Sequence, residues 1–414
     1  MADKHSSVKG QYFLVHAIII WTFIATTSRS LRSPNGFAEA HWLLNYQFGF
    51  IRRGLIGSIC SLFSEAFNVQ MTPAAISVLS TITLYGMSLA FLFVFFRMIH
   101  RHQNKMDTTI LGIIFASSPF IVLNAHYFGY FDAVLYILTI GSVMMIFKRR
   151  LVLSEFFSSI AILVHESYLV VGMPVIFLAA LVTKQLEAER KTHRISTALA
   201  IAVPVGVFLL MPLCQRLTTD TSALRAQIAE RLISFGFVSL RGIFVAEFQT
   251  TSFIEYFQLQ HVNFFKNLFY PPVAASIGPA LITILVFIHL AFHIRPFSRF
   301  SIGVHSIILA PLVLHTVAWD TARITSYTIG SGLMVCWILS ETRKIYPIRN
   351  IFLLVALPTL IINIFGNVPL TEDRIDRFSF LYRFLLYLPP IIMVLIGIFQ
   401  NLQRDGSIEF QKRD

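Results

Sequence analysis

The chain is dominated by long apolar runs, and these runs leave few folds open to it. A transmembrane α-helix needs about 20 consecutive apolar residues to cross the hydrocarbon core of a bilayer. Of the 414 residues, 56% are hydrophobic and 13% are charged, whereas a typical soluble domain has about 25% charged residues. The sequence therefore predicts an all-α, polytopic membrane protein with about 10–12 transmembrane helices and with amphipathic interfacial helices in its outer loops.

Ten apolar runs are long enough to be single spans. They lie near residues 11–29, 74–96, 107–124, 131–147, 195–214, 273–293, 301–318, 324–340, 347–364 and 383–400. The segment 151–183 differs, because the basic clusters at 148–150 and 184–194 flank it and both favour the cytoplasmic side. We expect this segment to enter the membrane and return as two short helices that meet near Val164-His165-Glu166-Ser167.

The distribution of lysine and arginine indicates the orientation of the chain. With the N-terminus in the cytoplasm, about 20 of the 33 Lys and Arg residues fall into cytoplasmic loops and tails. We therefore expect a multi-pass protein of a bacterial inner (plasma) membrane with cytoplasmic N- and C-termini. Residues 1–414 are expected to form a single transmembrane domain, and the basic residues left on the outer side require another explanation.

Two outer segments are long. The first outer loop, 30–73, contains NYQFGFIRRGLIGS at 45–58 and then a helical stripe of apolar residues, which predicts an amphipathic helix at the membrane surface. The large outer loop, 215–272, is rich in aromatic residues. A third outer segment, TEDRIDR at 371–377, is highly charged, and we expect a solvated loop there.

Several classes of function are disfavoured. The net charge of +12 does not indicate nucleic-acid binding, because the basic residues serve as topology signals and contact lipid headgroups. Cys60, Cys214 and Cys336 lie in separate segments without a C-x-x-C pair, so neither a disulfide framework nor a structural zinc site is expected. Phosphate-binding Walker loops, dinucleotide fingerprints, HExxH and G-x-S-x-G are absent from the sequence.

The most conspicuous outer residues are Arg52 and Arg53. Arginine presents a planar fork of donors that matches phosphate oxygens, which suggests a phosphate clamp. The glycines at 49, 54 and 57 would let the backbone approach a ligand closely, and the amide of Gly54 at a helix N-terminus would favour an anion. The alternative is that both arginines anchor the amphipathic helix to lipid headgroups.

Acidic residues and a histidine provide candidates for acid–base chemistry. His165 and Glu166 lie at the expected turn between two short helices, where the pair could act as a general base or orient an acceptor. A polar turn at the membrane surface is the alternative. Glu39 is a lone acid in an apolar segment of the first outer loop, beside His41, and the alternative for it is a surface acid.

Further candidates for substrate binding lie at the ends of spans. Asp320 and Arg323 are one helical turn apart, so they form either an isolated ion pair or a second phosphate site in which the aspartate holds the arginine. Asp132 is a binding candidate and also a good N-cap for the helix that it begins. Tyr46 and His126 complete the set of substrate-binding candidates.

All of these clusters fall on the outer face in the expected topology. Ionisable residues at span ends cost several kcal/mol unless they are paired or lie in a wet cavity. A secondary transporter would show two related halves with polar or broken helices at the midplane, and neither is evident. An enzyme that acts at the outer face on a lipid-borne substrate fits better, with a transporter or a flippase for lipid-linked saccharide or another small solute as the alternative.

A first span, a long outer loop with an acid and amphipathic helices, and many spans with uneven loops resemble the GT-C integral membrane glycosyltransferases. The layout also resembles O-antigen polymerases and ligases, although no short diagnostic motif carries the likeness. The resemblance implies an acid of the first outer loop as base, and arginines that bind a polyprenyl-phosphate sugar donor. GT-C enzymes often carry an aspartate just after the first span, whereas here the acid before Arg52 is Glu39.

The resemblance implies a glycosyltransferase or polymerase of surface polysaccharide synthesis, which acts at the extracytoplasmic face on an undecaprenyl-linked sugar. The expected catalytic residues are Glu39, Glu166 and His165, with the base left open between the two glutamates. We expect no cofactor at this site, with a divalent cation left open, and no metal ligands. The expected partners are the lipid bilayer and a polyprenyl-phosphate-linked glycan.

Overall fold

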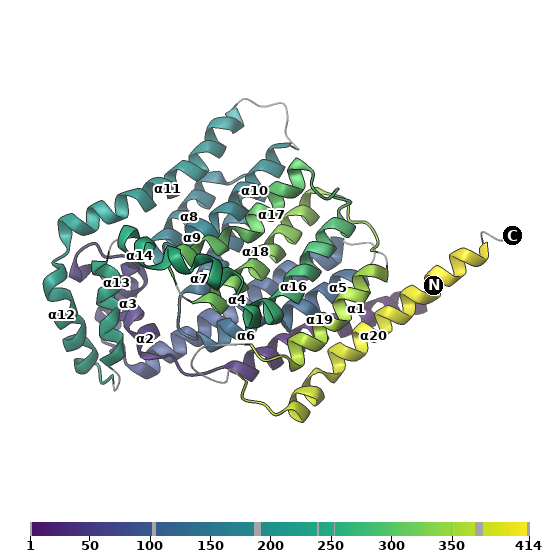
Figure 1. Ribbon diagram of the computed structural model, residues 1–414, viewed down its shortest axis with the longest axis horizontal. Coiled ribbons are helices and arrows are strands. Elements are labelled where there is room, and N and C mark those ends of the chain that lie inside the picture. The colour runs from purple at the N-terminus through teal and green to yellow at the C-terminus, as the bar shows by residue number, and fades with distance from the viewer. Residues whose placement is uncertain are drawn as a thin grey trace.

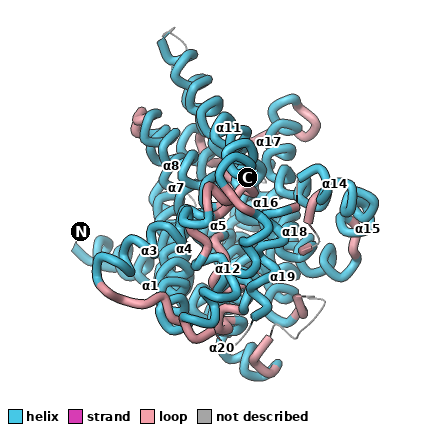
Figure 2. Tube along the Cα trace, turned by 90° about the vertical axis from the view of Figure 1, so that its left-hand side faces the viewer, coloured by secondary structure: helices cyan, strands magenta, loops and turns pink. Residues whose placement is uncertain are grey.

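The computed structural model describes residues 2–101, 105–185, 192–237, 240–251, 253–318, 320–348, 350–368 and 376–411. In this part of the chain the secondary structure is helical, without strands (Figures 1 and 2). The chain is thus an all-α, polytopic membrane protein.

The first half of the chain forms α1 to α10 and one 3₁₀ helix. They are α1 (Ala2–Ser30), α2 (Gly36–Leu43), η1 (Tyr46–Phe48), α3 (Gly54–Phe67), α4 (Pro73–Arg101), α5 (Lys105–Ala116), α6 (Pro119–His126), α7 (Asp132–Phe147), α8 (Leu151–Val164), α9 (Tyr168–Val171) and α10 (Met173–Gln185).

The second half begins with a long helix and continues through short helices before the last spans. Its elements are α11 (Thr192–Thr218), α12 (Thr221–Ser234), η2 (Leu240–Phe244), α13 (Val245–Thr250), α14 (Phe253–Gln260), η3 (His261–Asn263), α15 (Phe264–Leu268), α16 (Pro271–Ala291), α17 (Arg299–Leu309), η4 (Ala310–Thr316), α18 (Thr321–Thr342), α19 (Asn350–Phe365) and α20 (Phe380–Gln411).

Among the described residues, 7 helical segments are long and apolar enough to cross a membrane, by length and composition. They are Phe13–Ser30, Pro73–Arg101, Lys105–His126, Ile201–Thr218, Pro271–Ala291, Arg299–Thr316 and Phe380–Gln400. Several shorter apolar helices, including α7, α8 and α19, complete the bundle. One span is broken in its middle, because Pro119 lacks the amide needed to continue α5 and instead begins α6.

The segment 151–183 folds as two helical legs around a turn. α8 ends at Val164, His165 has extended backbone, and α9 begins at Tyr168. α9 leads directly into α10, and both α8 and α10 pack against α7. The turn at 165–167 thereby lies at the same end of α7 as its first residue, Asp132.

The core lies between the long helices. α18 is buried along most of its length, and it packs against α16, α6, α10 and α17. Trp337 of α18 and the aromatic side chains of α4, α5 and α6 fill the interior. A second apolar cluster joins α2 and α3 to α8 and α12, which lie together on the left in Figure 1.

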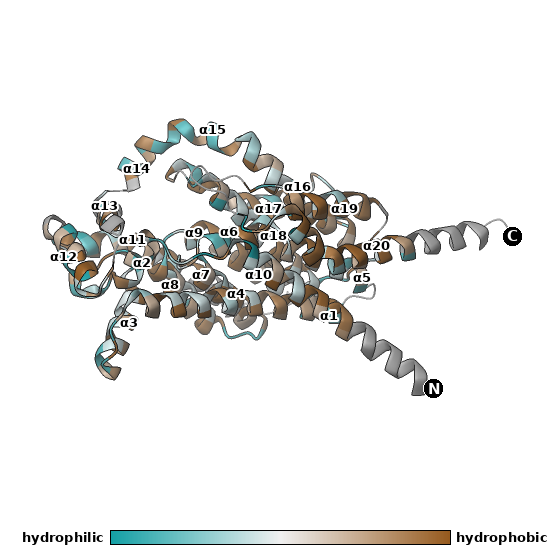
Figure 3. Ribbon diagram, turned by 90° about the horizontal axis from the view of Figure 1, so that it is seen from below, coloured by the Kyte–Doolittle hydropathy of each residue, from teal (hydrophilic) through white to brown (hydrophobic). Residues whose placement is uncertain are grey.

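Hydropathy separates the bundle from its periphery. The helices α16 and α19 and the coloured part of α20 are mainly brown in Figure 3, whereas teal segments occur in α12, α14 and α15. On α3 the large apolar side chains Ile59, Leu62, Phe63 and Phe67 are exposed. This helix thus presents an apolar face outward, as a helix at the surface of a bilayer does.

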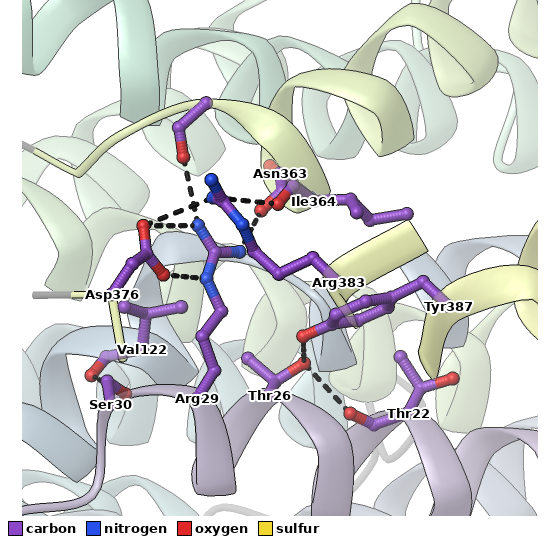
Figure 4. Close-up of polar contacts among 11 residues, drawn as sticks. Thr22, Thr26, Arg29, Ser30, Val122, Asn363, Ile364, Asp376, Arg383 and Tyr387 are labelled. Carbon is purple, nitrogen blue, oxygen red and sulfur yellow. Dashed lines mark hydrogen bonds and ion pairs between the residues drawn. The ribbon is translucent and has the colours of Figure 1, made fainter. Parts of the chain in front are cut away.

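A cluster of polar contacts ties α1 to α19 and α20 (Figure 4). Arg29, at the end of α1, is fully buried and forms a bidentate ion pair with Asp376; its Nη2 donates to Oδ2 at 2.8 Å. Its remaining donors reach the backbone carbonyls of Asn363 (2.6 Å) and Gly366 (2.9 Å). Arg383 of α20 donates to the same carboxylate at 3.3 Å.

This cluster corrects the expectation of a solvated loop at 371–377. The side chain of Asp376 is only 11% exposed, because it neutralises a buried arginine. Glu372, Asp373 and Arg374 lie outside the described residues. The segment is therefore, at least at Asp376, part of the packing between the first and last spans.

We predict that Asp376→Asn lowers the free energy of unfolding by about 3–5 kcal/mol, because it leaves Arg29 buried without its counter-charge. The thermal unfolding midpoint of the purified protein in detergent measures this loss. Glu247→Gln is the matched control, since the Arg225–Glu247 pair is 62% and 54% exposed and contributes at most about 1 kcal/mol. Equal midpoints for the two variants would contradict the role of Asp376.

Candidate functional site

Arg53 and Glu166 form an ion pair between two segments that are 113 residues apart in the sequence. The Nε of Arg53 donates to Oε1 at 3.2 Å and to Oε2 at 3.0 Å, and its Nη2 also donates to Oε1. The side chains are 17% and 24% exposed. Arg53 also has a left-handed backbone, with φ of 61°, which is unfavourable for a residue with a β-carbon. The surroundings thus hold this arginine in a strained conformation, a feature that is common at functional sites.

Two histidines border this pair. His41 on α2 donates from Nδ1 to the carbonyl of Phe37 at 2.8 Å, because a carbonyl can only accept. Its Nε2 therefore carries the lone pair that accepts from Nη1 of Arg53 at 3.0 Å. The Nδ1 of His165 accepts from the amide of Ser167 at 3.1 Å and lies 3.6 Å from Oε2 of Glu166.

The ionisation of these groups follows from burial and from the charge of Arg53. Burial and then Arg53 lower the pKa of His165 to about 4, and they hold the pKa of His41 well below its usual range. Burial alone would raise the pKa of Glu166, but the charge of Arg53, with its hydrogen bonds, holds that pKa well below the usual range. At neutral pH the two imidazoles are therefore neutral and Glu166 is an anion.

A second ion-pair group lies where α7 and α18 begin. The Nε and Nη2 of Arg323 donate to the two carboxylate oxygens of Asp132 at 2.6 and 2.9 Å. Asp320 is 3.5 Å from Nη1 of the same arginine and accepts from the hydroxyl of Tyr127 at 2.8 Å. The guanidinium also lies over the ring of Tyr130, 4.4 Å from its centroid.

The sequence left open whether Asp320 and Arg323 form an isolated ion pair, and the geometry shows that the pair is not isolated. They do form an ion pair one helical turn apart, but the shorter contacts of Arg323 go to Asp132. Asp132 is not the N-cap of α7, because Phe131 occupies that position and Asp132 is the first helical residue. Its carboxylate faces Arg323 instead of the helix amides.

The two groups lie close together and form one polar cluster. His41 packs against the rings of Tyr130 and Phe131, with centroids 5.9 and 6.2 Å away. Trp42 fixes this arrangement by donating from Nε1 to the carbonyl of Gly129 at 2.7 Å. His165 interacts electrostatically with Arg53, Glu166, Asp132 and Arg323. We call this end of the bundle the site end.

Arg52 borders the cluster but makes different contacts. Its Nη2 donates to the carbonyl of Thr251 at 2.9 Å, and its own carbonyl accepts from Gln249 at 3.0 Å. It interacts electrostatically with Glu166 and with Arg53. The loop before α3 is in this way joined to the end of α13 and to the residue that follows it. With Arg52, the site end holds three arginines and three carboxylates.

The glycines of this loop do not leave room for a ligand. A β-carbon at position 49 would lie 2.2 Å from the carbonyl oxygen of Thr218, and one at position 57 would lie 1.9 Å from that of Leu44. The amide of Gly54 donates to the carbonyl of Ile51 at 3.3 Å. The expectation that these glycines admit a ligand is therefore wrong, since their space is filled by the protein itself.

The ion pairs described above do not include three of the expected site residues. Glu39 is on the same helix as His41 but is rotated from it by roughly 200° around the helix axis, and within the described chain its carboxylate has no hydrogen bond or ion pair. Tyr46 stacks on Phe50 at 5.1 Å, and its buried hydroxyl has no partner in the described structure. His126 packs edge-on against Tyr127 at 5.4 Å.

Residues that the sequence did not single out complete the cluster. In the sequence, His41 was noted only as a neighbour of Glu39, and Tyr127 and Tyr130 were not singled out. The sequence feature that could have pointed to these three residues is a polar side chain at the end of an apolar segment. Among the described residues, no group of three or more His, Cys, Asp or Glu could hold a metal ion.

We predict that the stability of the fold falls between about pH 6.5 and pH 4. In this range the unfolded chain protonates His165, whose free pKa is about 6.5, while the folded chain keeps it neutral, so up to about 3 kcal/mol of stability is lost as the pH falls. His165→Asn should make the thermal midpoint less dependent on pH. His261→Asn, on the exposed η3, is the control, and equal slopes for all three proteins would contradict the prediction.

Comparison with known proteins gives a family without an assigned function. No curated protein and no solved structure matches the chain. The model of the family described as uncharacterised membrane protein Rv1490 matches residues 12–254, which is more than half of the 414 residues and includes α2, Arg53, Asp132 and the 165–167 turn. The chain therefore belongs to the Rv1490 family of uncharacterised membrane proteins.

Proposed function

We propose that this protein is a membrane glycosyltransferase or polymerase that uses a polyprenyl-(di)phosphate-linked sugar at the extracytoplasmic face of a bacterial inner membrane, in surface polysaccharide synthesis. The observation that carries the proposal is the Arg53–Glu166 pair, with two neutral histidines beside it. A strained arginine, a carboxylate and imidazoles at one end of an apolar bundle are typical of a reaction centre rather than of a structural contact.

The arginines supply the ligands for the donor phosphate. Arg53 is partly exposed, and Arg52 lies beside it in the sequence, so one phosphate can accept from both guanidinium groups. Charge-assisted hydrogen bonds of this kind are about twice as strong as neutral ones. Because Glu166 neutralises Arg53 in the free protein, an incoming phosphate must compete with that carboxylate.

This competition couples donor binding to base strength. The pKa of Glu166 is low chiefly because Arg53 faces it, so the carboxylate is a weak base in the free protein. When Arg53 turns to a phosphate, Glu166 loses hydrogen bonds and attraction, and its pKa rises. The carboxylate thus becomes a competent base only when a donor is bound. This argument favours Glu166 over Glu39 as the base.

The reaction then balances without a metal ion. Glu166 accepts the proton of an acceptor hydroxyl, whose oxygen forms a bond to the anomeric carbon of the donor sugar. The bond from that carbon to the phosphate oxygen breaks, and the phosphate leaves with its charge compensated by Arg52 and Arg53. His165 lies 3.6 Å from Glu166 and is placed to help orient the acceptor.

The surroundings offer room for lipid and sugar. α3 begins directly after Arg53 and exposes apolar side chains from Ile59 onward, so a polyprenyl chain in the bilayer can follow this helix toward the cluster. A pocket of about 520 Å³ is lined by Thr251, Glu255, Gln258 and Leu259. Its hydroxyl, carboxylate and amide groups match the hydroxyls of a sugar, and the carbonyl of Thr251 accepts from Arg52.

We predict opposite effects of Arg53→Gln and Glu166→Gln on phosphate binding. Arg53→Gln should weaken the binding of undecaprenyl phosphate about 10–100-fold through the loss of charge-assisted hydrogen bonds. Glu166→Gln should bind equally or more tightly, because it removes the competing carboxylate. Native mass spectrometry in phosphatidylcholine nanodiscs gives both affinities, with Arg225→Gln as the control on an exposed arginine. If both variants bind like the wild-type protein, or if phosphatidylglycerol binds equally well, Arg53 is only a headgroup anchor.

Glycan transfer should separate binding from chemistry. In cells whose single copy of the chain carries Glu166→Gln, the rate of surface-glycan synthesis should fall about 10²–10⁴-fold, the usual contribution of a general base. Incorporation of a radiolabelled sugar measures this rate.

Arg52→Ala should also lower the rate of surface-glycan synthesis, through the loss of phosphate binding. Full glycan output by both variants would overturn the mechanism. Translocation of a lipid-linked saccharide in proteoliposomes without a covalent product would identify a flippase.

A further inference from the structure

Two histidines face each other at the opposite end of the bundle. His289 lies near the end of α16 and His305 lies in α17, and their Nε2 atoms are 3.3 Å apart. Both helices pack against α18. α18 carries Arg323 near its beginning and ends at Thr342, next to the loop that contacts the end of α16 through Tyr346 and Ala291. At 1.5 Å per residue, the pair is about 30 Å from the candidate site.

The backbone fixes the tautomer of both rings. The Nδ1 of His289 lies 2.8 Å from the carbonyl oxygen of Ile294, and the Nδ1 of His305 lies 2.6 Å from that of Ser301. A carbonyl oxygen can only accept, so each Nδ1 carries a hydrogen. In a neutral imidazole the other nitrogen then has none, and two lone pairs therefore meet between the Nε2 atoms.

The orientation of the rings shows that these lone pairs converge. The ring centroids are 5.1 Å apart, farther than the Nε2 atoms, so each ring turns its Nε2 edge toward the other. Two lone pairs at this distance repel unless a cation lies between them. Zinc binds imidazole nitrogen at about 2.0–2.1 Å with tetrahedral angles, which places two ligand nitrogens about 3.3–3.4 Å apart. The observed separation matches this value.

The hydrogen bonds on the far side of the rings are also those of metal ligands. A histidine that binds a metal through one nitrogen usually donates its other N–H to a carboxylate, a backbone carbonyl or water, which fixes the ring and raises its basicity. We propose that His289 and His305 bind one divalent transition-metal ion of the zinc type between α16 and α17. The two protein nitrogens leave its other positions to water or to a small ligand.

Metal titration of the purified protein tests this proposal. The protein is prepared with an affinity tag that contains no histidine, and Co²⁺ is added as the optical probe for zinc sites. We expect saturable binding of one Co²⁺ per chain with intense tetrahedral absorption bands, displacement by Zn²⁺, and an increase in the thermal midpoint with either metal. His289→Gln and His305→Gln should each abolish the bands and the increase in the midpoint.

His293→Gln is the matched control. His293 lies in the same region but stacks on Tyr346 with centroids 4.0 Å apart, so its removal should leave Co²⁺ binding unchanged. Metal-free thermal midpoints show whether the two Gln variants fold. If the wild-type protein binds no Co²⁺, the pair shares a proton instead of a metal and the proposal is wrong. Binding that persists in a His289→Gln/His305→Gln double variant would also overturn it.

Discussion

The ion pair between Asp132 and Arg323 is the interaction on which the site end depends. It joins the first residue of α7 to the first turn of α18, and the side chains are only 5% and 14% exposed. Breaking such a pair leaves a buried charge without compensation, which costs about 3–5 kcal/mol. Because α8 and α10 pack on α7, the pair also sets the position of the 165–167 turn. The contact of Glu166 with Arg53 follows from that position.

The spans were predictable because each one satisfies its backbone hydrogen bonds within itself and meets lipid or apolar side chains outside. Run length and local charge therefore suffice to locate them, and even the break at 165–167 followed from two basic clusters. Long-range pairing was not predictable in this way. Nothing in TEDRIDR indicates that Asp376 meets Arg29, since their contact arises from the packing of α1 against α20.

The candidate site was partly predictable for the same reason. Charged residues at the ends of apolar spans need partners, so Arg53, Asp132, Glu166 and Arg323 stood out. Which partner each one takes depends on the order in which the helices pack, and the sequence does not contain that information locally. His41 was overlooked because a histidine beside an acid on a short helix has no distinctive pattern. The glycines at 49 and 57 were misread, because glycine is needed wherever another group closely approaches the backbone. That group can be another part of the protein, as it is here, or a ligand.

The arrangement of charges constrains any mechanism. Three arginines and three carboxylates balance at the site end, and the neutral histidines add no charge. A site of this kind does not attract a phosphate by net charge. In the proposed mechanism, Arg53 binds the phosphate by exchanging its carboxylate partner for it, so phosphate binding and the change in the state of that carboxylate occur in the same step. Glu166 is the carboxylate best placed for that exchange, since it is the ion-pair partner of Arg53, is 24% exposed and has a histidine beside it.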